Sequence, residues 1–115
     1  MPYLNLITNV KVADGRAFAL EFSKLGAEVL SKPEEYISVS ITYNDTLTFN
    51  GTFDPAFQLV ITSLGNINGS KNVVYSKKLF SFLKEKLGIP DNRGYIVFQD
   101  PGVENLGFRS TTFFA

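Results

Sequence analysis

The sequence predicts an α+β fold in which a β-α-β unit is used twice, so that a four-stranded sheet carries two helices on one face. Two stretches place apolar residues at helical spacing, and each lies between segments with the composition and alternation of strands. Short segments of the first half also recur in the second half. The chain has 115 residues, enough for one core, so residues 1–115 are predicted to form a single domain.

The first half is predicted as strand, helix, strand. Residues 2–8 are apolar and β-prone, and residues 36–43 alternate isoleucine or valine with serine or threonine, as a half-buried strand does. Between them a helix begins after Asp14 and ends before Pro33. Its apolar stripe consists of Phe18, Phe22, Leu25 and Val29. Residues 46–49 follow as a short strand or the arm of a turn.

The second half repeats this order. Residues 55–64 are predicted as a strand, and residues 70–87 as a helix that ends at Gly88. The stripe of this helix consists of Tyr75, Leu79, Phe82 and Leu83. Residues 95–99 form the last central strand, and the aromatic tail that follows is predicted as a short edge strand.

Two sets of matching segments support the duplication. Residues 6–10 (LITNV) resemble residues 60–64 (VITSL) at an offset of 54, while Tyr36-Ile37 and Phe49 recur as Tyr95-Ile96 and Phe108 at an offset of 59. Right-handed crossovers put both helices on one face of the sheet. The alternation assigns Tyr36, Ser38, Ser40 and Thr42 to the far face. Small hydroxyl side chains of this kind suit a wet interior shared between subunits.

Composition excludes several kinds of chemistry. Lysine plus arginine equal aspartate plus glutamate at 11 each, so the basic excess that a nucleic-acid partner requires is missing. Histidine and cysteine are both absent, which removes the usual ligands and nucleophiles of metal, haem and thiol chemistry. We therefore expect no metal and no cofactor. Carboxylates, lysines, tyrosines, hydroxyls and a terminal amine remain as catalytic groups.

Targeting signals are not evident. The N-terminus has no positively charged region before an apolar segment, and no stretch approaches the roughly 18 apolar residues that a membrane helix needs. We expect a cytoplasmic protein without a membrane partner. Sequons at Asn44, Asn50 and Asn68 are interpreted as turn chemistry, since Asn-Gly adopts positive φ at low cost.

Pro2 is the first candidate catalyst. If Met1 is removed, which a small second residue generally permits, the Pro2 nitrogen becomes a free secondary amine instead of an amide. Such an amine can act as a base. The alternative is purely structural, because a proline at the first position of a strand has no ladder hydrogen bond to lose.

The ordered set of motifs extends this interpretation. The chain contains Met1-Pro2 with Thr8-Asn9-Val10, Lys32-Pro33-Glu34-Glu35-Tyr36, Ser63-Leu64-Gly65, Tyr75-Ser76-Lys77, Asp91-Asn92-Arg93-Gly94-Tyr95-Ile96, and Gly107-Phe108 leading to Thr112-Phe113. Over essentially its whole length it resembles the macrophage migration inhibitory factor and D-dopachrome tautomerase family, within the tautomerase superfamily. The resemblance implies a homotrimer whose sheets surround a solvent channel, with an active site at each subunit interface.

The resemblance also implies a reaction and the residues that perform it. The reaction is keto–enol tautomerisation of arylpyruvates such as phenylpyruvate, with dopachrome isomerisation as a related activity. Pro2 would be the base, its protonated form disfavoured by desolvation and by the cationic Lys32. Lys32 would bind the substrate carboxylate, and the Leu64 N–H would donate to the developing negative charge. Tyr36 and Phe113 would form the pocket wall, together with Tyr95 from a neighbouring subunit.

Each of these residues has a plainer alternative. Lys32 also suits the C-terminus of the preceding helix, where a cation complements the dipole. The aromatic residues also suit strands that fill a core. A second functional hypothesis is a cytokine-like protein, released without a signal peptide, that binds a cell-surface receptor and keeps a weak or vestigial pocket.

Three departures from the family pattern matter for specificity. Val97 stands where vertebrate members carry an asparagine that reaches the hydroxyl of a hydroxyphenyl substrate. The family's Cys-x-x-Cys falls around residues 56–59 and is absent, and Phe108 replaces a common indole. One extra residue near the C-terminus leaves the choice between Phe113 and Phe114 for the pocket open.

Overall fold

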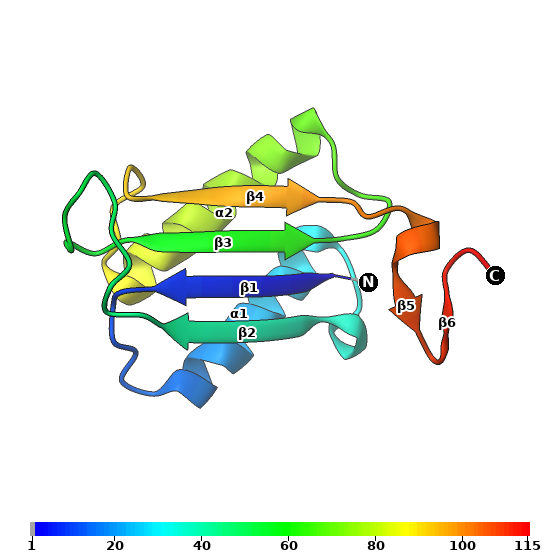
Figure 1. The fold of residues 1–115 in the computed structure, drawn as a ribbon, viewed down its shortest axis with the longest axis horizontal. Coiled ribbons are helices and arrows are strands. Elements are labelled where there is room, and N and C mark those ends of the chain that lie inside the picture. The colour runs from blue at the N-terminus through cyan, green and yellow to red at the C-terminus, as the bar shows by residue number, and fades with distance from the viewer. Residues whose placement is uncertain (1) are drawn as a thin grey trace.

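The computed structural model describes residues 2–115 as two layers, a four-stranded sheet and a pair of helices on one of its faces (Figure 1). The strands are β1 (Tyr3–Thr8), β2 (Ser38–Tyr43), β3 (Phe57–Thr62) and β4 (Gly94–Gln99), and the helices are α1 (Gly15–Leu30) and α2 (Gly69–Leu87). Short elements complete the chain: the 3-10 helices η1 (Glu34–Tyr36) and η2 (Val103–Asn105), and the strands β5 (Gly107–Phe108) and β6 (Thr111–Thr112).

The strand order confirms the duplicated β-α-β unit. The sheet has the order β2-β1-β3-β4, in which β1 is parallel to β2 and β3 is parallel to β4. Each parallel pair is joined through a helix, and the two units meet where β1 runs antiparallel to β3. Both helices cover the same face, as right-handed crossovers require (Figure 1).

The register corrects one detail of the predicted repeat. Leu6 pairs with Leu59, and both side chains are buried under the helices. Because paired residues of an antiparallel ladder share a face, equivalent positions of the two halves must differ by an odd number. The offset of 54 is therefore wrong, since it matches the buried Leu6 with Val60 on the open face. The offset of 59 is odd and keeps Ile37 and Ile96 on the helical side.

Both helices begin and end where local chemistry predicts. The Asp14 carboxylate accepts a hydrogen bond from the Ala17 N–H at 3.1 Å, which caps α1. The Asn68 side chain accepts from the Lys71 N–H at 2.9 Å and caps α2 in the same way. Gly88 ends α2 at φ 68°, a left-handed conformation that glycine adopts without steric cost.

The core lies between the sheet and the helices. The fully buried apolar side chains of the strands are Leu4, Leu6, Phe57, Leu59 and Ile61. Against them pack the rings of Phe18, Phe22 and Phe82, with centroids 5.9 Å apart for the first two and 5.6 Å apart for the last two. Burial of each such side chain contributes about 1.5 to 3 kcal/mol to the free energy of unfolding.

The open face of the sheet carries the hydroxyl side chains that the sequence assigns to it, with one exception. Ser38, Ser40 and Thr42 are exposed there, whereas Val39 and Ile41 pack against the core. Tyr36 does not belong to this face. The chain takes one 3-10 turn after Pro33, with the Tyr36 N–H donating to the Pro33 carbonyl at 3.0 Å, so β2 begins two residues later.

The C-terminal tail forms a small hairpin of its own. The prediction of an edge strand is wrong for the chain's own sheet, because within residues 2–115 β5 and β6 pair with each other and with no strand of that sheet. Positive φ values at Arg109 (53°) and Ser110 (64°) turn the chain back after only two residues. Figure 1 shows this hairpin standing beyond the sheet, at the end where β1 begins.

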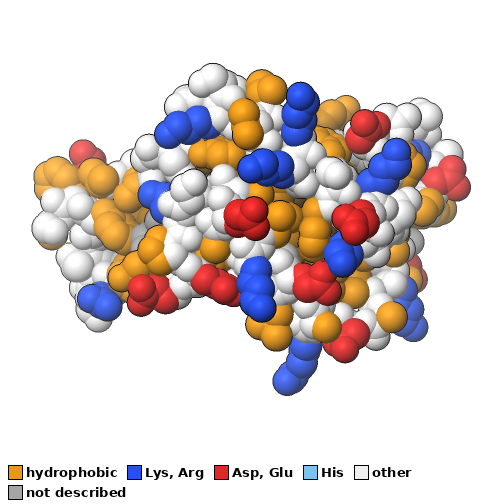
Figure 2. Space-filling model, turned by 180° about the vertical axis from the view of Figure 1, so that it is seen from behind, with side chains coloured by type: hydrophobic (Ala, Val, Ile, Leu, Met, Phe, Trp, Pro, Cys, Tyr) orange, Lys and Arg blue, Asp and Glu red, His pale blue; other side chains and the backbone are white. Residues whose placement is uncertain are grey.

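The helical face carries charges of both signs. In Figure 2 the lysine and arginine side chains are interspersed with aspartate and glutamate over this face. The phosphate backbone of a nucleic acid lying on this face would meet repulsive carboxylates as well as attractive cations. None of the helices among residues 2–115 is long and apolar enough to cross a membrane, and the same residues hold no group of three or more aspartates and glutamates suited to a metal ion.

Candidate active site

The predicted site begins at one end of the sheet. Pro2 directly precedes β1; its carbonyl accepts a hydrogen bond from the Ser38 N–H at 3.2 Å, and its side chain is fully buried. Lys32 follows the end of α1, and Leu64 follows the end of β3. Because β3 runs antiparallel to β1, its last residues return to the start of β1. The fold therefore brings these three segments to the same end of the sheet.

Lys32 and Leu64 are in direct contact. The Lys32 Nζ donates a hydrogen bond to the Leu64 carbonyl at 3.4 Å. The Lys32 backbone N–H donates to the Ala27 carbonyl at 3.0 Å. The residue therefore caps α1 with its main chain, and its side chain extends to Leu64. Within residues 2–115 the ammonium group forms no ion pair. It is thus a half-buried cation available to a carboxylate.

The Leu64 peptide is held on both sides. The preceding N–H, of Ser63, donates to the Gln99 carbonyl at 2.9 Å, and the following N–H, of Gly65, donates to the Asp100 carboxylate at 2.9 Å. Among the residues that the structure describes, the Leu64 N–H itself has no acceptor. A donor whose neighbours are fixed in this way is preorganised for an anion.

Asp100 carries the charge that anchors this segment. Hydrogen bonds from the N–H groups of Gly65 and Gly102 hold the pKa of the Asp100 carboxyl below its ordinary value. Both bonds stabilise the ionised form. The carboxylate therefore fixes the Gly65 peptide next to Leu64 at neutral pH.

Aromatic rings form the wall of a hollow beside these groups. Phe108 meets Tyr36 edge-on, with centroids 6.0 Å apart and planes at 85°, and stacks on Phe113 at 6.2 Å and 7°. The hollow has a volume of about 620 Å³. It is lined by Lys32, Pro33, Tyr36, Leu64, Phe108, Arg109, Thr111, Thr112, Phe113 and Ala115. Four of the seven predicted site residues thus line one cavity, and Pro2 lies at the adjacent sheet end.

The hollow distinguishes between the two C-terminal phenylalanines. Phe113 lines it, whereas Phe114 does not and has 70% of its surface exposed. The reason is the short β5–β6 hairpin, in which the Phe113 N–H donates to the Leu106 carbonyl at 3.2 Å. That bond holds the Phe113 ring beside Phe108.

Tyr95 and Val97 lie at a different place in the same chain. They stand on the open face of β4, 71% and 46% exposed. Tyr95 is near the end of β1, because Gly94 pairs with Phe57 and Phe57 with Thr8. Six strand residues, about 20 Å, separate that end from Pro2. A single chain does not bring Tyr95 to the hollow.

Sequence reasoning missed the groups that support Tyr95. The Arg93 guanidinium donates to the carbonyls of Phe49 at 2.9 Å, Asp54 at 2.7 Å and Pro55 at 3.2 Å. The Phe49 ring in turn lies 5.4 Å from the Tyr95 ring. Arg93 belongs to a quoted motif, but only the fold shows which carbonyls it binds. Sequence reasoning also missed Arg109, which lines the hollow, because the sequence gives no signal for it.

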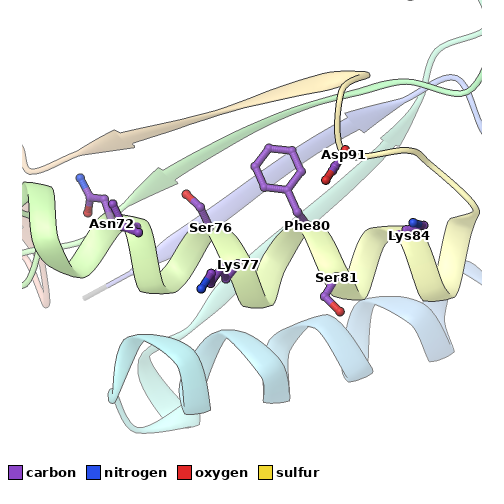
Figure 3. Close-up of a pocket in the computed structure, with 8 residues that line it drawn as sticks. Asn72, Ser76, Lys77, Phe80, Ser81, Lys84 and Asp91 are labelled. Atoms are coloured by element: carbon purple, nitrogen blue, oxygen red, sulfur yellow. The ribbon is translucent and has the colours of Figure 1, made fainter.

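A second hollow lies along α2, away from these residues. Its volume is about 700 Å³, and it is lined by Asn72, Val73, Ser76, Lys77, Phe80, Ser81, Lys84 and Asp91. Figure 3 shows Phe80 pointing from α2 toward the sheet, where its ring meets Phe57 edge-on at 5.5 Å. None of the predicted site residues lines this hollow.

Two helices on one face of a sheet made from two β-α-β units are the architecture of the tautomerase superfamily. The family model for macrophage migration inhibitory factor (MIF) matches residues 1–114. The chain belongs to the MIF family, which confirms the resemblance found in the sequence.

Relatives and solved structures agree with this assignment. The macrophage migration inhibitory factor homologs of Trichinella spiralis and Trichuris trichiura are 40% and 41% identical over 114 residues, covering 98% of this chain and 100% of each relative. The structure of the Trichinella spiralis protein superposes with a TM-score of 0.90 at 39% identity, over 96% of this chain and 99% of that one. A homologue from Prochlorococcus marinus gives 0.89 at 32% identity, over 96% and 98%.

Proposed function

We propose that the protein is a tautomerase of phenylpyruvate-type 2-oxo acids, with the Pro2 amine as general base after removal of Met1. One observation carries the proposal: the Lys32 ammonium, 3.4 Å from the Leu64 carbonyl, stands at an aromatic-walled hollow at the end of the sheet where β1 begins. A cation, a fixed peptide donor and aromatic rings match the carboxylate, the carbonyl oxygen and the ring of an arylpyruvate. Membership of the MIF family supports the same reaction class.

The proposed mechanism moves one proton. Lys32 binds the substrate carboxylate, and the aromatic wall holds the ring. The Pro2 nitrogen removes a proton from the carbon between ring and carbonyl; the C–H electron pair forms the new carbon–carbon double bond, and the carbonyl oxygen becomes an enolate. The Leu64 N–H donates to that oxygen while the charge develops. The protonated amine then returns the proton to the oxygen, which gives the enol and restores the base.

We also propose a homotrimer in which Tyr95 and Val97 of a neighbouring subunit complete the pocket. Support comes from the sheet, which is covered on one face only, and from the protruding hairpin with its exposed Phe108 and Phe114. Light scattering should give about three times the 12.8 kDa chain mass. A monomer at micromolar concentration would refute the shared site, because Tyr95 and Pro2 would then belong to no common pocket.

Turnover of phenylpyruvate tests the proposal. Intact mass spectrometry first establishes whether Met1 is removed. Pro2→Gly should keep the fold and lower kcat/KM for phenylpyruvate by about 10²-fold or more, the scale of a lost general base. A matched control keeps Pro2 and adds one residue before it, so that the ring remains but the nitrogen stays an amide. Loss of activity in the extended variant supports the amine as base, whereas wild-type activity in that variant overturns it. Pro2→Gly keeps a primary amine, so it measures how far the reaction needs the secondary amine of proline.

A second candidate is a signalling role, which the names of the relatives favour. The matched proteins of rat and mouse are described as macrophage migration inhibitory factor, at 35% identity. In this alternative the protein is released from the cytoplasm and binds a cell-surface receptor. Saturable binding to intact cells that survives in Pro2→Gly supports it. Absence of such binding, together with robust phenylpyruvate turnover, supports the enzymatic function and contradicts the signalling role.

A further inference from the structure

The hollow contains a second cation that the proposed reaction does not use. Arg109 lines it together with Lys32, and none of the lining side chains is acidic. We propose that Arg109 is a second anion-binding residue, so that the hollow takes aromatic ligands with two carboxylates in preference to those with one. This deepens the proposed function, on which it rests for the assignment of the hollow as substrate site.

The turn that contains Arg109 has a backbone conformation that its residues disfavour. Phe108 pairs with Thr111, so Arg109 and Ser110 form a two-residue hairpin turn, both at positive φ (53° and 64°). This is the pattern of a type I′ turn, which strongly prefers Asn-Gly because other residues meet steric repulsion at positive φ. Residues kept in such a conformation cluster at functional sites. The strained turn is an observation independent of the cavity.

The local contacts orient the Arg109 side chain without neutralising it. Its guanidinium carbon lies 5.3 Å from the centre of the Phe108 ring, a cation–π arrangement. Within residues 2–115 the guanidinium donates no hydrogen bond and forms no ion pair. Its planar set of donors therefore remains available, and that geometry matches a carboxylate.

The arrangement defines the ligand class. The Phe108 and Phe113 rings stack with centroids 6.2 Å apart and give the hollow an apolar wall, and the Arg109 guanidinium lies over the Phe108 ring. An aromatic ring placed against this wall directs one carboxylate to Lys32 and a second to Arg109. An aromatic monocarboxylate leaves the guanidinium in water, so it gains only the first of these interactions.

Binding of two ligands that differ by one carboxymethyl group, and so by one negative charge, tests this inference. Wild-type protein should bind benzylsuccinate about two- to five-fold more tightly than 3-phenylpropanoate, the scale of one further, solvent-exposed ion pair. Arg109→Asn should abolish the difference, because asparagine accepts positive φ and so keeps the turn while removing the charge. Arg16→Asn, the same charge change on the exposed N-terminal turn of α1, should leave the difference intact.

Two outcomes overturn the inference: equal affinities in the wild type, or a preference for the dicarboxylate that survives Arg109→Asn. Arg109→Lys should retain part of the preference, and about 0.5 M salt should reduce it in the wild type, since exposed charges are screened. Titration calorimetry on the assembled protein measures binding without turnover. A failed base assignment at Pro2 would therefore leave this result unaffected, and the two failures remain distinguishable.

Discussion

The ring of Phe57 occupies the space that a side chain at Gly94 would need. A β-carbon at residue 94 would lie 2.4 Å from Cδ1 and Cε1 of that ring, closer than real contacts allow. The two residues pair in the parallel ladder of β3 and β4. Glycine at this position therefore permits β4 to join the sheet and to present Tyr95 on its open face.

Gly94→Ala should consequently destabilise the fold. Phe57 is fully buried and cannot move aside without displacing its neighbours, so the free energy of unfolding should fall by about 1 to 3 kcal/mol. Urea denaturation followed by circular dichroism measures this change. Gly69→Ala is the matched control, because a β-carbon there meets nothing within 4 Å and φ is ordinary. An unchanged midpoint for Gly94→Ala would show that the Phe57 ring has room to shift.

Asn9 should make a large contribution to stability for a side chain that is only partly buried. Its amide group donates to the carbonyls of Leu47 at 3.2 Å, Phe53 at 3.1 Å and Asp54 at 2.9 Å, and its oxygen accepts from the Ala56 N–H at 2.8 Å. Asn9→Ala should lower the free energy of unfolding by about 2 to 3 kcal/mol, since several backbone groups lose partners. Asn9→Asp keeps the acceptor but turns a carboxylate oxygen toward three carbonyl oxygens, so it should be at least as destabilising as alanine at neutral pH in the same denaturation experiment.

Asp100 should make stability depend on acid pH. Its carboxyl has a lowered pKa in the folded protein because the Gly65 and Gly102 N–H groups donate to it. The contribution is therefore fully present above the ordinary value of 3.8 and is lost as pH falls through the lowered pKa. Melting temperatures of wild type and Asp100→Asn should differ at neutral pH and converge below about pH 4. A constant difference across that range would assign the effect to packing instead of ionisation.

Local chemistry in the sequence was sufficient for most of the fold. Asp14 and Gly88 mark helix ends because capping depends on one or two residues, and alternation marks β2 because a strand has period two. The Arg109-Ser110 turn could not be predicted, because neither residue is typical of positive φ. Tyr36 continued the alternation of the strand, and only the turn after Pro33 removes it from β2.

The candidate site was less accessible to sequence reasoning than the fold. Lys32 and Leu64 are 32 residues apart, and their contact exists only because the end of β3 returns to the start of β1. Local patterns likewise do not reveal that Tyr95 lies at the opposite end of the sheet from Pro2. The resemblance implied that Lys32 and Leu64 share a site and that Tyr95 comes from a neighbouring subunit, and Arg109 remained unnoticed because no motif contains it.

Lys32→Gln should weaken binding of the substrate carboxylate more than it affects the chemical step. Glutamine can still donate to the Leu64 carbonyl, so the fold should remain, but the charge is lost. KM for phenylpyruvate should rise by about 10-fold or more, the scale of a charge-assisted hydrogen bond. The methyl ester of phenylpyruvate, which has no carboxylate, should show no such change. A similar rise in KM for acid and ester would mean that Lys32 supports the structure of the pocket and does not bind the substrate carboxylate.

Val97 should set the preference for the substituent on the substrate ring. It shares the open face of β4 with Tyr95, as the alternation with Ile96 and Phe98 in the core requires. It presents methyl groups at the position where the family resemblance implies an asparagine amide in vertebrate members. A phenol hydroxyl buried against valine would lose a hydrogen-bond partner at a cost of about 1 to 3 kcal/mol. Phenylpyruvate should therefore exceed 4-hydroxyphenylpyruvate by about ten-fold or more in kcat/KM. Val97→Asn should narrow that ratio. Equal selectivity in the two proteins would show that residue 97 does not contact the ring, and the proposed contribution of a neighbouring β4 to the pocket would be wrong.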